Sequence, residues 1–243
     1  GPVMHLSTIR IALLALFVVA AGAADQEQLK KAYLKLGKPF GVEAIPEEHT
    51  IKAVFFTGGH KKDKLKTLVP VNAEGVKDGL EFEKLPFWMT VTHIVPYAEG
   101  VRHGVERKFH YNKVPGSREK ERIVTEETPW VDGEIHGTRI MRHTNGETQN
   151  EIPFQHGKQH GTSKTYDKEG RLKRETIYVE GQREGPMVEY YPESGQVKRR
   201  LPYVEDQVHG VVEEFYSDGQ LKRRIELVDG EYHGVYEEYA GDG

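Results

Sequence analysis

Alternating apolar and polar residues dominate the second half of the chain, and this period of two is the pattern of β-strands with two unlike faces. In the segment Val211–Tyr216, successive side chains are expected to point to opposite sides, and Leu221–Leu227 repeats the alternation. Asp218-Gly219 lies between the two segments, and glycine supplies the positive φ that a tight turn requires. The pattern therefore predicts a β-hairpin over residues 211–227.

This hairpin is one copy of a repeat. Each copy opens with a turn of the form G-x-x-H-G, and the second glycine of the turn recurs at spacings of 25, 33, 24, 24, 25 and 24 residues. A regular step of this length accommodates two strands and two short turns, and it indicates an array over residues 50–243. The turn glycines are Gly79, Gly104, Gly137, Gly161, Gly185, Gly210 and Gly234. The residue before the glycine is His103, His136, His160, His209 or His233, with Asp78 and Glu184 in the other two copies.

One copy is longer than the others. The additional residues lie in Tyr111–Ile123, where Pro115-Gly116-Ser117 predicts an inserted loop. The repeat has no structural need for such a loop, and long loops in compact folds are often functional, so its cations are candidate binding residues. These cations are Arg118, Lys120 and Arg122. The alternative is a tolerated surface insertion, because lengthening a loop costs little free energy.

The residues before the array divide into three segments. Gly1–Val3 is interpreted as an expression scar, and Met4–Ala23 has the charged start, apolar stretch and small-residue end of a signal peptide. The alternative for this apolar segment is a membrane anchor that is not cleaved. Residues 24–49 are expected to form a helix and a linker. The helix is predicted over Asp25–Leu36, where it would dock on the first edge of the array, although a partner-binding helix is the other interpretation.

Composition narrows the function further. The chain has 243 residues, a formal net charge of −4 and no cysteine. The near-neutral charge gives no electrostatic case for nucleic acid, and without cysteine there is no disulfide or thiol nucleophile. None of the common catalytic motifs is present, so we expect no enzyme activity and no cofactor.

The repeated segments resemble a known family. The segments GEYHGVYEEY, GKQHGTSKTY and DQVHGVVEEFYSDGQLK are similar to MORN repeats (membrane occupation and recognition nexus), in particular to the variant found in exported bacterial proteins and in toxin–antitoxin components. The resemblance is strong over Tyr97–Tyr239 and weaker from residue 50. It implies an all-β, elongated single-layer antiparallel meander of hairpins and a binding or assembly role without catalysis. Asp206, which replaces the first glycine of one turn, departs from the pattern.

The repeated histidines invite a comparison with metal sites. Equivalent residues of neighbouring hairpins are expected two strands apart, roughly 9.5 Å. Zinc requires ligand nitrogens at about 2.0–2.1 Å, so neighbouring histidines do not share an ion without a further ligand between them. We therefore expect a structural role in the turns and no metal.

Three further columns of residues recur with the repeat. An aromatic column is expected in the core, the alternative being a platform that stacks on sugars or a peptide, and it comprises Phe109, Tyr166, Tyr190, Phe215 and Tyr239. A second column lies one residue further on, faces the other side and is the candidate exposed binding surface; it comprises Tyr191 and Tyr216, with His143. An arginine column is expected to pair across strands with Glu189, Glu213 or Glu214, and it comprises Arg174, Arg199 and Arg223.

The sequence thus predicts an exported, non-enzymatic repeat protein, in the periplasm or outside the cell, that binds another protein as a scaffold. Two alternatives remain open: a module that binds carbohydrate or another envelope component, and an antitoxin or immunity protein that blocks a toxin. The second of these rests on the family resemblance alone. No membrane-spanning segment is expected in the mature chain.

Overall fold

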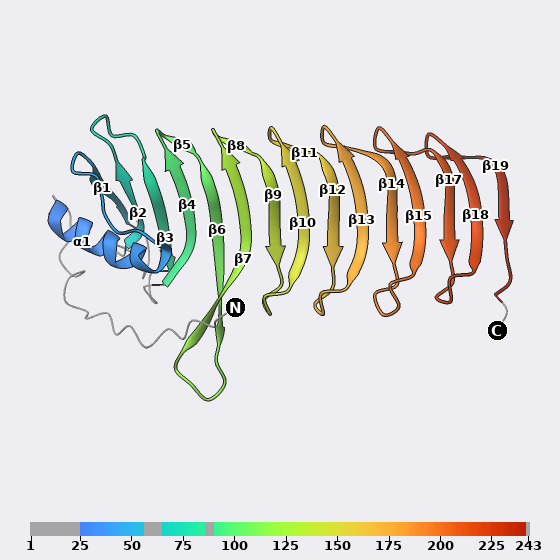
Figure 1. Ribbon diagram of the computed structural model, residues 1–243, viewed down its shortest axis with the longest axis horizontal. Helices are drawn as coiled ribbons and strands as arrows, with labels where there is room; N and C mark the ends of the chain where they lie inside the picture. The colour runs from blue at the N-terminus through green and yellow to red at the C-terminus, as the bar shows by residue number, and fades with distance from the viewer. Residues whose placement is uncertain (1–24, 56–64, 86–89, 242–243) are drawn as a thin grey trace. The chain divides into compact units, whose positions relative to one another are not determined.

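The computed structural model describes residues 25–55, 65–85 and 90–241, in which nineteen strands and one α-helix are present (Figure 1). The strands pair antiparallel as successive hairpins of an open sheet, and the helix precedes them. The predicted β-hairpin fold with one N-terminal helix is therefore confirmed. Gly1–Val3 and the expected signal peptide Met4–Ala23 lie outside the described residues.

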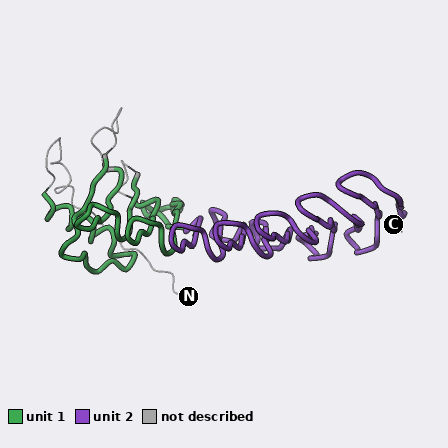
Figure 2. The backbone as a smooth tube through the Cα atoms, turned by 90° about the horizontal axis from the view of Figure 1, so that it is seen from above, with its two compact units in different colours: residues 1–123 green, residues 124–243 purple. Residues whose placement is uncertain are grey.

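The chain divides into two compact units, residues 1–123 and 124–243 (Figure 2), and each is described by itself. Unit 1 contains the helix α1 (Gln26–Gly37) and the short 3₁₀ turn η1 (Lys38–Phe40). Its strands are β1 (Thr50–Phe55), β2 (Leu65–Val71), β3 (Gly79–Leu85), β4 (Thr90–Ala98), β5 (Val101–Arg102), β6 (Gly104–Lys113) and the start of β7 (Lys120–Val131).

After β7, the described residues of unit 2 form hairpins and no helix. Its further strands are β8 (Glu134–Ile135), β9 (Gly137–Arg142), β10 (Thr148–Gln155), β11 (Lys158–Gln159), β12 (Gly161–Tyr166), β13 (Leu172–Val179), β14 (Gln182–Tyr190), β15 (Val197–Val204), β16 (Gln207–Val208), β17 (Gly210–Phe215), β18 (Leu221–Val228) and β19 (Glu231–Glu238). No described helix covers either face of this unit, so its sheet is a single layer.

The turn glycines have the conformation that the repeat requires. Gly161 has φ +109°, and a Cβ on this residue would approach Cγ of Pro153 to 3.2 Å. The neighbouring residue, His160, donates its backbone N–H to the carbonyl oxygen of the same proline at 3.0 Å. His136 and His209 make the same bond to Pro129 and Pro202, at 3.1 and 3.0 Å. Glycine is required because the backbone bends sharply against a proline ring.

Asp206 stands where the other turns have their first glycine, and a contact with the preceding turn explains this aspartate. It keeps a positive φ of 68°, a region that aspartate tolerates better than most residues. Its carboxylate accepts hydrogen bonds from the backbone N–H and from Nε of Arg183, at 3.0 and 2.9 Å. These bonds lower the pKa of Asp206 and hold two successive turns together.

The helix α1 begins and ends close to the predicted residues. Asp25 is the N-cap, and its carboxylate accepts the backbone N–H of Glu27 at 3.0 Å. Leu29 and Tyr33, which are one turn apart on the helix, are buried. The hydroxyl of Tyr33 donates to the carbonyl oxygen of Leu80 at 2.9 Å, so the helix is fixed to strand β3.

The same helix covers the edge strand β1. The side-chain amide of Gln26 accepts the backbone N–H of Ile51 at 2.8 Å and donates to the carbonyl oxygen of Ile51 at 3.2 Å. One side chain thereby satisfies both backbone groups that a neighbouring strand would otherwise bind. The helix docks on the first edge, as expected.

The core of unit 1 forms beneath the helix. Phe82 is fully buried, and its ring centroid lies 5.1 Å from that of Tyr33 and 5.7 Å from that of Phe40. Phe40 also lies 5.6 Å from Phe109. Four aromatic rings from the helix, the 3₁₀ turn and two strands therefore form one contiguous cluster.

The longer copy differs from the predicted inserted loop. Tyr111–Lys113 extends strand β6, and strand β7 already begins at Lys120, so only residues 114–119 form a loop. Pro115-Gly116-Ser117 lies in this loop, as predicted, whereas the candidate cations Lys120 and Arg122 lie on strand β7 and not in the loop. The additional residues are accommodated because both strands of one hairpin become longer together.

Candidate functional site

Two rows of alternating charges run across strands β13 to β19 of unit 2, one on each face. On the first face, which we call the arginine face, Arg199 lies 3.3 Å from Glu189 and 3.9 Å from Glu214. Glu214 also accepts a hydrogen bond from Arg223 at 2.8 Å, and the two arginines lower its pKa. The strand register continues the row through Arg174 opposite Glu189 and Glu238 opposite Arg223. The predicted pairing of the arginine column is confirmed for Arg199 with Glu189 and for Arg223 with Glu214.

On the opposite face, Glu213 pairs with Arg200 at 3.3 Å. Glu213 does not pair with the arginine column, because the alternation of side chains along β17 places Glu213 on the opposite face. Arg224 and Glu237 form the next pair at 3.6 Å. Such half-exposed pairs each contribute little stability, and their regularity instead fixes the register of the strands.

The aromatic column lies on the same face as Glu213 and is only partly core. Phe109, in unit 1, is buried as expected, whereas Tyr239 is 40% exposed. The hydroxyl of Tyr190 donates to Glu175 at 2.7 Å, and that of Tyr166 donates to Glu151 at 3.1 Å. Burial, followed by the bond to Glu175, raises the pKa of Tyr190 to about 12. These hydroxyls remain protonated donors over the physiological range.

The second column, with Tyr191 and Tyr216, lies in the turns at one end of the hairpins. The hydroxyl of Tyr191 donates to the carbonyl oxygen of Phe215 at 2.9 Å, and that of Tyr216 donates to the carbonyl oxygen of Tyr239 at 3.0 Å. His143 occupies the equivalent place, with Nε2 at 3.4 Å from the carbonyl oxygen of Tyr166. Each side chain therefore reaches the next hairpin, and its ring is half-buried.

A cation accompanies each of these two tyrosines. Nζ of Lys198 lies 5.9 Å from the ring centroid of Tyr191, and Nζ of Lys222 lies 5.5 Å from that of Tyr216. Lysine ammonium groups at this distance are attracted to the face of an aromatic ring. We call these four residues the tyrosine–lysine surface.

The three cations of the long copy have different surroundings. Arg118 is exposed in the loop, and Lys120 is exposed at the start of β7. The guanidinium of Arg122 lies 4.6 Å above the ring of Phe40 and 5.2 Å from that of Phe109. Arg122 therefore covers the aromatic cluster, while Arg118 and Lys120 face solvent.

The turn histidines contact the next turn. Nδ1 of His209 lies 3.2 Å from Asp229, and Nδ1 of His160 lies 3.6 Å from Glu180. Among the described residues, no group of three or more histidine, aspartate or glutamate side chains is arranged to hold a metal ion.

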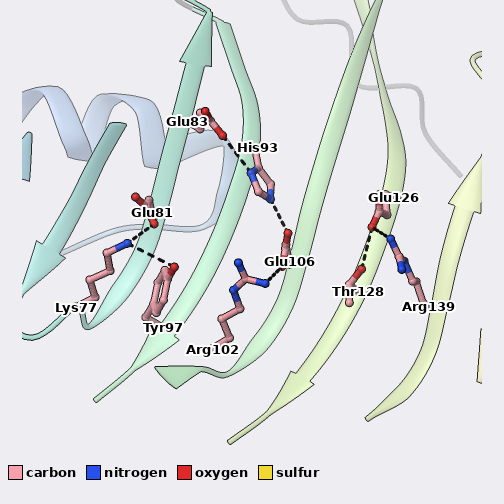
Figure 3. Close-up of polar contacts among 10 residues, drawn as sticks. All are labelled: Lys77, Glu81, Glu83, His93, Tyr97, Arg102, Glu106, Glu126, Thr128 and Arg139. Atoms are coloured by element: carbon pink, nitrogen blue, oxygen red, sulfur yellow. Dashed lines mark hydrogen bonds and ion pairs between the residues drawn. The ribbon is translucent and has the colours of Figure 1, made fainter. Parts of the chain in front are cut away.

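A further polar network on unit 1 was not anticipated (Figure 3). His93 on β4 lies between two carboxylates, with Nε2 at 2.6 Å from Glu106 and Nδ1 at 3.2 Å from Glu83. Arg102 pairs with the second oxygen of Glu106 at 3.4 Å. Glu106 is buried, so its charge depends on these partners. His93 precedes the turn glycine Gly104 by the same spacing as Arg199 precedes Gly210, and this position in the repeat was the one signal that the sequence offered.

This network predicts a pH-dependent stability. The hydrogen bond with Glu106, assisted by Glu83, raises the pKa of His93 above its ordinary value of 6.5. The stabilisation is thus fully present below about pH 6.5 and is lost as the pH rises through the folded-state pKa. We expect the urea-denaturation midpoint of the chain to fall between about pH 6 and pH 8. The variant His93→Gln should flatten this dependence, and the exposed turn variant His209→Gln should retain it; equal slopes in all three proteins would contradict the assignment.

A cavity of about 260 Å³ lies between the linker and the sheet of unit 1. Its lining includes Tyr33, Ile45, Leu80 and the pair His49–Asp78, in which Nε2 and Oδ2 are 2.9 Å apart. Asp78 replaces the turn histidine in this copy, and it therefore fixes the linker to the first turn of the array.

Comparison with known families identifies two of the repeats. The MORN repeat variant matches residues 159–180 and 208–229. Each matched segment contains one complete hairpin, β12–β13 or β17–β18. No curated protein matches the chain. MORN repeats are generally protein-interaction modules without catalytic activity.

Proposed function

Because two of its hairpins are MORN repeat variants, we propose that this chain is a non-enzymatic scaffold that binds another protein. The observation that carries the proposal is the match to an interaction repeat over two complete hairpins. In unit 2, the described residues form an uncovered single-layer sheet, which offers an extended surface rather than a closed pocket.

The tyrosine–lysine surface is the proposed place of contact. Tyrosine is enriched at protein interfaces because it supplies a large contact area with few rotatable bonds. The hydroxyls of Tyr191 and Tyr216 already bind backbone carbonyl oxygens, so the rings are held in place before a partner arrives. This preorganisation reduces the entropy that binding costs.

We further propose that the scaffold is exported, on the basis of the sequence of Met4–Ala23. No helix in the described part of the chain is long and apolar enough to cross a membrane. Intact-mass measurement of the protein isolated from its native source tests the proposal, which requires loss of the residues up to Ala23.

Photo-crosslinking tests the binding function. With a benzophenone amino acid in place of Tyr191 or Tyr216, we expect a covalent adduct with a defined protein when the chain is mixed with material from its native compartment. The matched control carries the same group in place of Val179, an exposed residue at the end of β13, which lies at the opposite end of the strands from Tyr191. Equal adducts from all positions, or binding of glycans without a protein adduct, would contradict the proposal.

A further inference from the structure

A β-bulge occurs at the same place in three successive hairpins of unit 2, and its additional residue is a lysine each time. In the hairpin β12–β13, Leu172 and Arg174 lie opposite consecutive residues of β12, so Lys173 between them has no residue opposite it. The registers of the next two hairpins omit Lys198 and Lys222 in the same way. A bulge turns its additional side chain away from the regular pairing of the strands. These three lysines, which we call the lysine row, therefore stand apart from the charges that pair across the sheet.

The ammonium groups of the lysine row have no carboxylate partner. Among the described residues, none of the three forms an ion pair or donates a side-chain hydrogen bond. Arg199 and Arg223, which directly follow Lys198 and Lys222, each pair with a glutamate instead. The contacts of Lys198 and Lys222 are with the rings of the tyrosine–lysine surface, and Lys173 is exposed. The row therefore offers three positive charges to an anion from outside the chain.

The carboxylates of the neighbouring turns restrict the kind of anion that fits. Asp167, Glu169 and Glu193 surround Arg171, at 2.8, 3.3 and 3.4 Å. Asp218 accepts a backbone N–H of its own turn at 2.9 Å. Glu169 and Glu193 remain largely exposed, so they repel a ligand that is negatively charged along its whole length. A segment whose carboxylates are separated by neutral residues avoids this repulsion.

The spacing of the lysine row selects one backbone conformation for such a segment. Its members belong to β13, β15 and β18, and one long strand, β14 or β17, lies between each pair of neighbours (Figure 1). Strands that are two apart are separated by roughly 9.5 Å. A polyproline II helix has three residues per turn and rises about 3.1 Å per residue. Every third side chain of this helix therefore lies on the same side, about 9.3 Å from the last.

The other regular conformations do not follow the row. Side chains on one side of a β-strand recur at about 6.6 Å, which is too short for the distance between neighbouring lysines. Those on one face of an α-helix recur after two turns, at about 10.5 Å, and drift out of step along the row. The polyproline II helix is the one that keeps a carboxylate beside each lysine.

The two tyrosines provide a surface for the residues between the carboxylates. Tyr191 and Tyr216 occupy equivalent places in neighbouring hairpins, so their rings repeat with the same step as the lysines. Hydrogen bonds from both hydroxyls to backbone carbonyl oxygens hold the rings in place. Aromatic side chains arranged in this way are the usual receptors of proline-rich segments in the polyproline II conformation.

We propose that the tyrosine–lysine surface, extended by Lys173, binds a polyproline II segment of a partner protein, and that this segment carries a carboxylate at every third residue with proline between. The inference rests on the proposed scaffold function and specifies the chemistry of the partner. Each carboxylate lies beside one lysine, and the prolines lie against the two tyrosine rings. The flexible stems of the lysines adjust to the twist of the sheet.

Two synthetic peptides of the same composition test the spacing. The peptide PPEPPEPPEPP has a glutamate at every third position, and the peptide PPPPEEEPPPP has the three glutamates together. Both carry a fluorescent label and are titrated with the full chain, and binding is followed by fluorescence anisotropy. We expect the spaced peptide to bind roughly tenfold more tightly, because only its glutamates reach successive lysines.

Charge reversal tests the contribution of the lysines. The double variant K198E/K222E should weaken binding of the spaced peptide roughly tenfold, since two attractive contacts become repulsive. The peptide PPKPPKPPKPP should show the opposite preference and bind the double variant better than the parent chain. The matched control is K158E, which alters an exposed lysine on β11 that pairs with Glu180 and lies outside the row. Circular dichroism spectra equal to that of the parent chain show that both variants are folded.

Four outcomes would overturn the proposal: no binding of the spaced peptide, equal binding of the two acidic peptides, binding that is indifferent to K198E/K222E, or tighter binding of the sulfated polysaccharide heparin than of the spaced peptide. The scaffold function fails separately, because it is tested by crosslinks at Tyr191 and Tyr216. A protein adduct there, without affinity for the spaced peptide, would refute this partner chemistry and leave the scaffold function standing.

Discussion

Replacing Phe82 with alanine is expected to lower the free energy of unfolding of unit 1 by about 3–5 kcal/mol. Phe82 is fully buried, and it contacts both Tyr33 of the helix and Phe40 of the 3₁₀ turn. Alanine at this position would leave a cavity at the centre of the aromatic cluster. The helix α1 has only twelve residues and depends on this packing, so it should lose its order first.

Hydrogen exchange and urea denaturation measure this loss. Amides of α1, β1 and β3 should exchange faster in Phe82→Ala, whereas those of Val212 and Ile225 should be unchanged, because strands of an array contact only their neighbours. The matched control is Phe215→Ala. Phe215 is half-buried in the single layer of unit 2, so the cost should be smaller. A cost for Phe82→Ala no greater than that of Phe215→Ala would contradict the assignment of the core.

The variant Gly161→Val is expected to destabilise unit 2 by roughly 2–5 kcal/mol. The backbone at Gly161 has φ +109°, which a β-branched residue does not adopt without strain. A Cβ there also meets Cγ of Pro153 at 3.2 Å, so the proline or the turn must move. Both effects act on the same turn, where His160 donates its N–H to Pro153.

A neighbouring glycine provides the control. Gly157 has φ +76° and open space at the position of a Cβ. Asparagine tolerates this region, so Gly157→Asn should change the urea midpoint only slightly. Circular dichroism during urea denaturation compares the two variants. If Gly161→Val has the same urea midpoint as the parent chain while Gly157→Asn has a lower one, the assignment of Gly161 as the conformationally restricted glycine is contradicted.

The hairpins were predictable because they are local. Alternation over Val211–Tyr216 and the turn at Asp218-Gly219 predicted strands β17 and β18, and Asp25–Leu36 predicted a helix that the structure places at Gln26–Gly37. The burial of the two faces was not predictable from alternation. Val212 is buried and Val211 is 37% exposed, although both are valines in the same strand. The difference depends on neighbouring strands, which the sequence of one hairpin does not specify.

The contacts between distant residues were the least predictable part. Phe40, Phe82 and Phe109 belong to three separate elements, and no periodicity connects Phe40 with the strands. The additional residues of the long copy were predicted from the spacing alone, but spacing does not distinguish a longer loop from longer strands. The repeat predicted the positions of Tyr191 and Tyr216. It did not predict the polar network of His93, because a histidine stands there where later copies have an arginine.

The alternating charges have a consequence for how such arrays change in length during evolution. The two copies that comprise β14–β15 and β17–β18 each contribute one strand with a glutamate and one strand with an arginine to the row on the arginine face, namely Glu189 with Arg199 and Glu214 with Arg223. Duplication or loss of one of these copies therefore keeps the order of charges in the row. This part of the chain is free to lengthen or shorten by tandem duplication of its gene segment, while the alternation of charges is inherited unchanged.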